Sequence, residues 1–229
     1  VELHLAESVE VFQSGEGQNI QYALSDCRVL ADVYTLSSDL HNTFSQHILS
    51  GKSLAFPLKS LVNTQFQLQN TTPSFTLSLQ RAFSRFSSVF LVMQGTPTAT
   101  LRDVNTFMGG GPAETVSGIL TCGSKQFPDG HSVLGMSQWF LRLLQTLGVV
   151  HSGSHALDIT RDTFATTHFC AAFDLERVPH STRSGLNASR GESISVQMTG
   201  LGAAHQRALV MCHADLIMEL GDQGCTVLQ

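Results

Sequence analysis

Apolar and polar positions alternate along much of the chain with the period of two that is typical of β-strands. From Ser193 to Met198 the alternation is strict, and it puts Ile194, Val196 and Met198 on one face. Phe75–Leu79 follows the same pattern. Because successive side chains of a strand point to opposite faces of its sheet, these segments are predicted to be strands with one buried face.

Other segments are continuous apolar runs of strand length, as expected for strands buried on both faces. They are Val89–Met93, Phe169–Phe173 and Ala208–Cys212, and Val116–Cys122 is expected to be a further strand. Leu216–Leu220 is expected to be another strand, separated from Ala208–Cys212 by a polar kink at His213–Asp215. Extended structure is also expected at Val1–Leu5, at Leu54–Gln69 and at Ile20–Leu36, the last with a bend at Ser25–Asp26.

Two segments have the spacing of short helices. Leu40, Phe44 and Ile48 lie four residues apart between Ser37–Ser38 and Gly51, residue types that cap helices. From Met136 to Leu147 apolar residues recur at three- and four-residue intervals, and Gly148 ends the pattern. Trp139 lies on the apolar face of this second helix, where core or loop packing is its expected role.

These elements predict an all-β protein, a jelly-roll β-sandwich of about eight antiparallel strands with two short helices in loops. Strands joined by long polar loops, such as the Ser-, Arg-, Asn- and Gly-rich segment before Ser193, are typical of a sandwich or jelly roll. A parallel α/β fold would require a helix after nearly every strand, and the sequence does not supply them.

Composition limits the classes of function. Of 229 residues only 14% are charged, the net charge is −5, and Lys and Arg are scattered. Clustered cations are what binds phosphates, so autonomous, sequence-specific nucleic-acid binding is disfavoured. No apolar stretch approaches the roughly 20 residues of a membrane span. The chain begins with Val1, and we expect a fragment or processed piece of a longer protein.

The five cysteines are odd in number and form no CxxC pair. Cys170 and Cys212 lie within apolar runs, where a free thiol behaves as a small hydrophobic group. Reduced structural cysteines are therefore predicted in preference to disulfides or metal ligands.

Segments that resemble nucleotide- or metal-binding motifs are incomplete. Gly51-Lys52-Ser53 resembles the end of a phosphate-binding loop, but Gln46 stands where that motif requires a glycine. His151, His155 and Asp158 could converge on a metal ion. Their segment, HSGSHALD, contains Gly and Ser that disfavour a helix, so the four-residue spacing does not bring both imidazoles to one face. We interpret this segment as a polar loop.

Candidate catalytic residues also have simpler explanations. Ser137 lies in GMSQW, which lacks the final glycine of a hydrolase elbow, and fits the start of a helix. Asp174 and Glu176 would share a strand face as an acid–base pair, but the adjacent Arg177 favours a solvated strand end. Asn70 and Asn187 stand in glycosylation sequons that we interpret as turns. No catalytic, cofactor-binding or metal-binding residue is predicted.

The order of several segments carries a resemblance to a known family. They are SDCRVLADVYTLSSDLHNTFSQHILSGKSL, FSRFSSVFLVM, GSKQFP, MSQWFLRLLQTLG, ITRDTFATTHFCAAFDLERV, TRSGLNASRGESISVQMTGLG and ALVMCHADLIMELGDQGCTVL. From about Ile20 onward the chain resembles the C-terminal part of double-jelly-roll major capsid proteins. Relatives of this kind occur in Polinton-like transposons, adintoviruses, related large DNA viruses and capsid genes embedded in protist genomes.

The resemblance implies a structural protein of the virion and not an enzyme. Members of this family carry two barrels per subunit, and three subunits form a pseudo-hexagonal capsomer of an icosahedral shell. It implies as partners two further copies in a homotrimer, neighbouring capsomers, and penton and minor capsid proteins. Because the chain has the length of one barrel, we expect residues 20–229 to form a jelly roll and residues 1–19 to be an approach segment or the end of a preceding barrel.

Jelly-roll proteins have two other functions that we consider, and the fold alone does not decide between these and the capsid function. A carbohydrate-binding module would stack exposed aromatic residues on sugar rings, and the chain has one Trp and two Tyr. A cupin-like metalloenzyme would require an HxH pair, which the sequence lacks.

Overall fold

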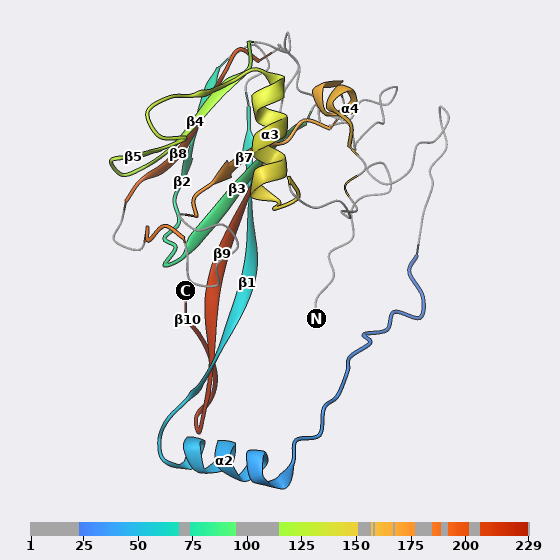
Figure 1. Ribbon diagram of the computed structural model, residues 1–229, viewed down its shortest axis with the longest axis vertical. Coiled ribbons are helices and arrows are strands. Elements are labelled where there is room, and N and C mark those ends of the chain that lie inside the picture. The colour runs from blue at the N-terminus through green and yellow to red at the C-terminus, as the bar shows by residue number, and fades with distance from the viewer. Residues whose placement is uncertain are drawn as a thin grey trace.

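The computed structural model describes residues 23–68, 74–94, 115–150, 157, 159–166, 168–176, 185–188, 192–201 and 207–228. Within these ranges the chain forms two five-stranded antiparallel sheets that share one core, with helices at their periphery (Figure 1). The first sheet has the order β1-β9-β3-β7 with β10 beside β9, and the second has the order β2-β8-β4-β5 with β6 beside β4.

The strands of the first sheet are β1 (Leu54–Gln67), β3 (Phe86–Gln94), β7 (Ala171–Asp174), β9 (Arg207–Gly221) and β10 (Gly224–Leu228). Those of the second are β2 (Phe75–Leu79), β4 (Ser117–Cys122), β5 (Lys125–Phe127), β6 (Val133–Leu134) and β8 (Ile194–Thr199).

The strand pairing is nested. β1 pairs with β9, β2 with β8 and β3 with β7, while β4 pairs with β5 and β6 at the centre of the nest. Successive pairs alternate between the two sheets. This is a long hairpin folded over on itself, which is the wrapping of a jelly roll. The predicted all-β jelly-roll fold is confirmed.

The core forms where the predicted alternation places it. On β8 the side chains of Ile194, Val196 and Met198 are fully buried, and the residues between them are not. β4 alternates in the same way, with Leu120 and Cys122 facing the core. One face of each sheet is therefore apolar, and the two faces meet in a single cluster.

Helix α3 (Met136–Thr146) packs against β7. The ring of Trp139 meets Phe173 edge to face with ring centroids 5.4 Å apart, and its indole N–H donates to the carbonyl oxygen of Val116 at 3.1 Å. A short helix, α4 (Arg161–Thr166), lies beside α3, and the ring of Phe164 contacts that of Phe140 in a tilted arrangement. The predicted helix is confirmed, with Gly135 at its N-cap, whereas α4 was not predicted.

Helix α2 (Ser38–Leu49) precedes β1 and has no buried residue. Its end is as predicted: Gly51 has φ of 78°, and its N–H donates to the Ile48 carbonyl oxygen at 2.9 Å. A positive φ is the conformation in which glycine terminates a helix without strain. Gly51-Lys52-Ser53 is thus the end of a capped helix.

Two strand predictions are wrong. β9 runs unbroken from Arg207 to Gly221, with no kink at His213–Asp215, because each of these residues keeps its partner on β1. The described part of Ile20–Leu36, residues 23–36, is not a strand, although the predicted bend is present at Asp26 with φ of 58°. A strand requires a hydrogen-bonded neighbour, and the described residues offer none to this segment. Val1–Leu5 lies outside the described residues.

Candidate interaction surface

The residues considered as catalytic candidates are not brought together. Ser137 Oγ accepts hydrogen bonds from the Arg161 guanidinium, at 3.1 Å from Nε and 2.8 Å from a terminal nitrogen, so its partner is a cation and not a base. Asp174 Oδ1 accepts a hydrogen bond of 2.9 Å from the backbone N–H of Glu176, and this bond closes a turn at the end of β7. These contacts hold local structure, and neither provides a nucleophile beside a base.

The remaining candidates lie either outside the described residues or on the surface. His151, His155 and Asp158 lie outside the described residues, as does Asn70. Asn187 is exposed. Within the described ranges, no group of three His, Cys, Asp or Glu side chains is placed to hold a metal ion. Nor do these ranges contain a helix long and apolar enough to cross a membrane.

Three cysteine thiols are held in the protonated form. Burial raises the pKa of Cys170 and of Cys212 to about 12. Burial and the hydrogen bond that Cys122 Sγ donates to Glu192 at 3.5 Å raise the pKa of Cys122 to about 11. The thiolate is the nucleophile and the metal ligand, so these three residues are structural. Cys27 and Cys225 are exposed.

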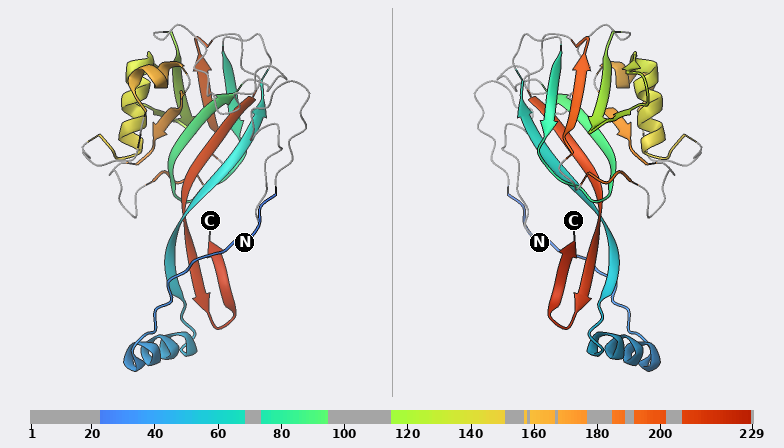
Figure 2. Two further views of the ribbon diagram at one scale, coloured as in Figure 1. Left: turned by 90° about the vertical axis from the view of Figure 1, so that its right-hand side faces the viewer. Right: turned by 90° about the vertical axis from the view of Figure 1, so that its left-hand side faces the viewer.

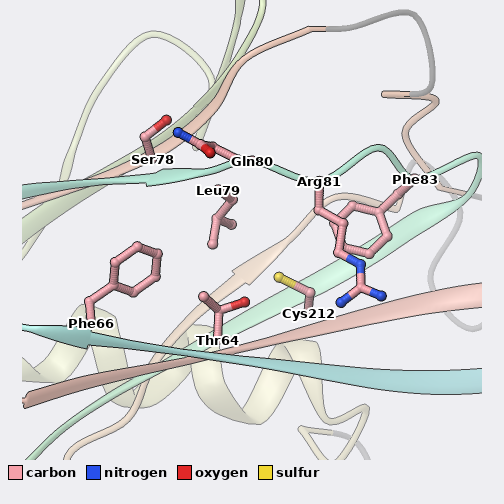
Figure 3. Close-up of a pocket in the computed structure, with 8 residues that line it drawn as sticks. All are labelled: Thr64, Phe66, Ser78, Leu79, Gln80, Arg81, Phe83 and Cys212. Atoms are coloured by element: carbon pink, nitrogen blue, oxygen red, sulfur yellow. The ribbon is translucent and has the colours of Figure 1, made fainter.

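A cavity of about 430 Å³ opens between the edge strands β1 and β2 (Figure 3). Its lining is Thr64, Phe66, Ser78, Leu79, Gln80, Arg81, Phe83 and Cys212. Arg81 is the charged residue of this set, and the set has no carboxylate or imidazole to act as a base. We interpret the cavity as the open edge of the sandwich, where the two sheets separate.

The most distinctive surface lies where the first sheet extends past the second. The N-terminal half of β1, the C-terminal half of β9 and β10 project from the sandwich as a three-stranded arm (Figure 2). We define the arm as Leu54–Lys59, Asp215–Gly221 and Gly224–Leu228. Helix α2 lies beyond its tip (Figure 1).

One side of the arm is entirely apolar. Antiparallel partners share a face, so the register Leu54–Leu220–Cys225, Phe56–Met218–Val227 and Leu58–Leu216 defines one surface, which we call the arm face. Its β9 residues alternate in step with Ala208, Val210, Cys212 and Ala214, which are buried in the sandwich core. All of these even-numbered residues therefore lie on the same side of β9. The arm face is therefore the core side of the sheet continued to where no second sheet among the described residues covers it.

Much of the arm face is open to solvent. Phe56 is 42% exposed and Val227 is 51% exposed. The opposite side of the arm is mixed, because it carries Lys59, Asp215 and Glu219 beside apolar residues. A contiguous apolar patch rimmed by polar groups is typical of an interaction site.

Residues 23–36, which we call the strap, add further exposed apolar groups. Val29 is 77% exposed, and Leu30 and Val33 are 94% and 90% exposed. An ion pair of 2.7 Å between Arg28 and Asp26 is local to the bend. In Figure 1 the strap runs apart from both sheets. A strand was predicted here, and in the described part of the chain this segment has no sheet to join.

Sequence reasoning did not find the arm. The signal was present in the parity of β9, since Leu216, Met218 and Leu220 continue the even-numbered apolar series that begins at Ala208. The kink expected at His213–Asp215 concealed it. β10, which widens the arm, was not predicted.

Comparison with solved structures returns viral capsid chains. VP54 of PBCV-1, in a crystal structure fitted into a cryo-EM reconstruction of the virophage Sputnik, superposes with a TM-score of 0.56 and 9% identity over 85% of this chain. A quasi-atomic model of the PBCV-1 virus capsid gives a TM-score of 0.52 and 8% identity over 81% of this chain. The chain shares its fold with these capsid structures.

The match is partial in length and restricted to structure. This chain covers 55% and 54% of the lengths of those two chains. A scan of known protein families finds no match, and no curated protein matches the sequence. At such low identity the likeness is one of fold.

Proposed function

We propose that the chain is a jelly-roll barrel of a structural capsid protein, viral or derived from a virus, that builds a shell in the virion through contacts with copies of itself. The observation that carries the proposal is the nested jelly roll, shared with the PBCV-1 capsid structures over more than four fifths of this chain. A shell protein needs exposed surface suited to neighbours, and the arm face is such a surface.

The finer features implied by the resemblance extend this proposal. In it, residues 20–229 are one barrel of a two-barrel subunit, and residues 1–19 are the approach to it or the end of the preceding barrel. Three subunits then form a pseudo-hexagonal capsomer that contacts neighbouring capsomers, penton proteins and minor capsid proteins. The coverage of about half of each PBCV-1 chain supports this division. No enzymatic activity is part of the proposal.

The alternative, a carbohydrate-binding module, has less support. The single tryptophan, Trp139, is fully buried, so it is not available to stack on a sugar ring. The cavity between β1 and β2 is lined by two aromatic residues, the half-buried Phe66 and the buried Phe83, which do not form an exposed aromatic platform (Figure 3). Neither comparison with a solved structure points to sugar binding.

The native mass of the purified chain tests the proposal. Sedimentation velocity over a range of concentrations, with negative-stain images of the same samples, is expected to show trimers, tiles or shells. A chain that stays monomeric at every concentration, and that binds members of a glycan array, would instead favour the carbohydrate-binding module.

A further inference from the structure

We infer that the arm face is a self-association surface, on which the arm face of a second copy of this chain packs. This inference rests on the proposed function and specifies one of the contacts through which copies meet. It is carried by three observations on the described residues: the parity of the arm, its lack of charge, and its shape.

The parity shows that the arm face is built as an interior surface. Every position of matching register on its three strands is apolar: Leu54, Phe56, Leu58, Leu216, Met218, Leu220, Cys225 and Val227. In the sandwich the same side of β9 is covered by the second sheet, and Ala208 and Val210 are fully buried there. Two sheets pack about 10 Å apart when their apolar faces meet. A second sheet on the arm face would continue that packing.

The distribution of charge allows a second copy to be the occupant. In a two-fold contact the same residues lie opposite one another, so any charged patch would repel its own image. The arm face carries no charged residue, whereas the reverse side of the arm carries Lys59, Asp215 and Glu219. The apolar side is the one on which two identical surfaces meet without like charges in contact.

The shape disfavours a small-molecule ligand. Small-molecule sites are concave and surround most of the ligand, with a few polar groups that orient it. The arm face is one side of a three-stranded sheet, and the cavity of about 430 Å³ lies elsewhere, between β1 and β2. An apolar sheet surface of this kind can pack against another sheet surface.

The size of the patch predicts a weak contact for one pair. Six residues of a strand extend about 20 Å and three strands span about 14 Å. This is smaller than the roughly 800 Å² that each partner of a standard interface buries. An isolated pair should therefore dissociate readily, and the contact gains strength when other contacts in an assembly hold the two copies together.

Adjacent residues of β10 provide a matched pair of variants. Val227 and Thr226 are both exposed, but Val227 lies opposite Met218 on the arm face and Thr226 lies opposite Glu219 on the reverse. V227K places a cation in the contact, and T226K places the same cation beside Glu219. F56K and A55K repeat the comparison on β1, where Phe56 lies on the arm face and Ala55 on the reverse.

Sedimentation velocity of the full chain is the first readout. We expect V227K and F56K to raise the dissociation constant by about tenfold or more, and T226K and A55K to leave it within about twofold of wild type. The near-UV circular dichroism of each variant checks that the sandwich is intact. Equal association of wild type and V227K would overturn the inference.

Cys225 reports on the contact directly, because it lies on the arm face and is exposed. In a Cys27→Ser background, its alkylation rate should fall as the protein concentration rises. A constant rate while association proceeds would place the contact elsewhere.

The outcomes separate this inference from the proposed function. Tiles or shells that form equally well from V227K and wild type would overturn the arm contact and leave the capsid proposal intact. A wild type that is monomeric in every sample would count against both.

Discussion

Gly118 on β4 lies against the ring of Trp139 on α3. A Cβ added at position 118 would lie 2.9 Å from Trp139 Cζ2 and would also collide with the sulfur of Met198. Because Gly118 has no side chain, the indole of Trp139 fits beside β4, where its N–H donates a hydrogen bond to the Val116 carbonyl oxygen.

Gly118→Ala is therefore expected to destabilise the fold. A real Cβ does not approach a ring carbon this closely, so Trp139 or Met198 must shift, at a cost of about 1–3 kcal/mol for overpacking. Urea unfolding followed by circular dichroism measures the change. Gly221→Ala is the control, because Gly221, like Gly118, has no positive φ, and a Cβ added there would meet only the Cβ of Ser53, at 3.9 Å. A loss in G118A no larger than the loss in G221A would contradict the assignment.

Trp139→Phe should lower the free energy of unfolding by about 2–4 kcal/mol, through loss of ring volume and of the hydrogen bond to Val116. The same residue provides a spectroscopic test, since it is the single tryptophan of the chain and is fully buried. Native protein should emit at short wavelength and shift to the red on unfolding. An exposed-tryptophan spectrum under native conditions would contradict its place in the core.

Val196→Asp and Phe173→Asp should each abolish soluble folding. Val196 is fully buried and Phe173 is 2% exposed, and a carboxylate there would have no partner. The cost of an unpaired buried charge rivals the total stability of a domain. Expression and solubility of each variant are the measurement, with Gln197→Asp as the control because Gln197 is exposed on the same strand. Well-folded V196D would show that the core is assigned to the wrong face of β8.

Stability should fall at alkaline pH because of the buried thiols. Each has a folded pKa of about 11 or 12 and an ordinary value of 9.0, so the folded state favours the protonated form. Their contribution is complete below pH 9 and is lost as pH rises toward 12, because the unfolded chain ionises first. Urea unfolding at pH 8 and pH 10 should show this loss, and Cys212→Ala should reduce its slope. An unchanged slope would mean that Cys212 is not shielded.

Labelling of native protein by a thiol reagent tests the same assignment in another way. Cys27 and Cys225 should react rapidly, and Cys122, Cys170 and Cys212 should react after unfolding. Mass spectrometry identifies the labelled peptides. Rapid labelling of Cys212 in native protein would show that the edge between β1 and β2 opens to the reagent.

The sequence was most informative where burial is local and periodic. β8 and α3 were predicted because one face of each is apolar and the other is polar, and that contrast is visible within a few residues. The jelly roll followed from the number of strands and the lengths of loops. The resemblance in segment order agreed with the fold that the structural comparisons then showed.

Prediction failed where the deciding interaction is distant in the chain. His213 and Asp215 are polar and suggested a kink, but the carbonyl oxygen of His213 accepts the Ser87 hydroxyl at 2.9 Å, and the N–H of Asp215 donates to Arg85 at 2.9 Å. Contacts with the start of β3 and with the residue before it thus accompany an unbroken β9. The strand predicted at the strap is wrong for the converse reason, because the described residues contain no strand with which it pairs.

Only the general character of the candidate surface could be predicted from the sequence, and not its location. A polar surface of low charge was evident from composition, but the arm depends on the register of β1, β9 and β10, which pairs Phe56 with Met218 and Met218 with Val227. No local pattern reveals that the second sheet stops short of these positions.

The nested pairing has a consequence for how the protein is made. Leu54 begins the ladder that Leu220 closes, so β1 leaves the ribosome long before its partner strand has been synthesised. Throughout that interval the apolar side of β1 has no cover, and closing so long a loop makes folding slow. Until β9 has been made, this exposed strand is a site at which the newborn chain can aggregate. Its outermost ladder, which includes the arm, is completed last.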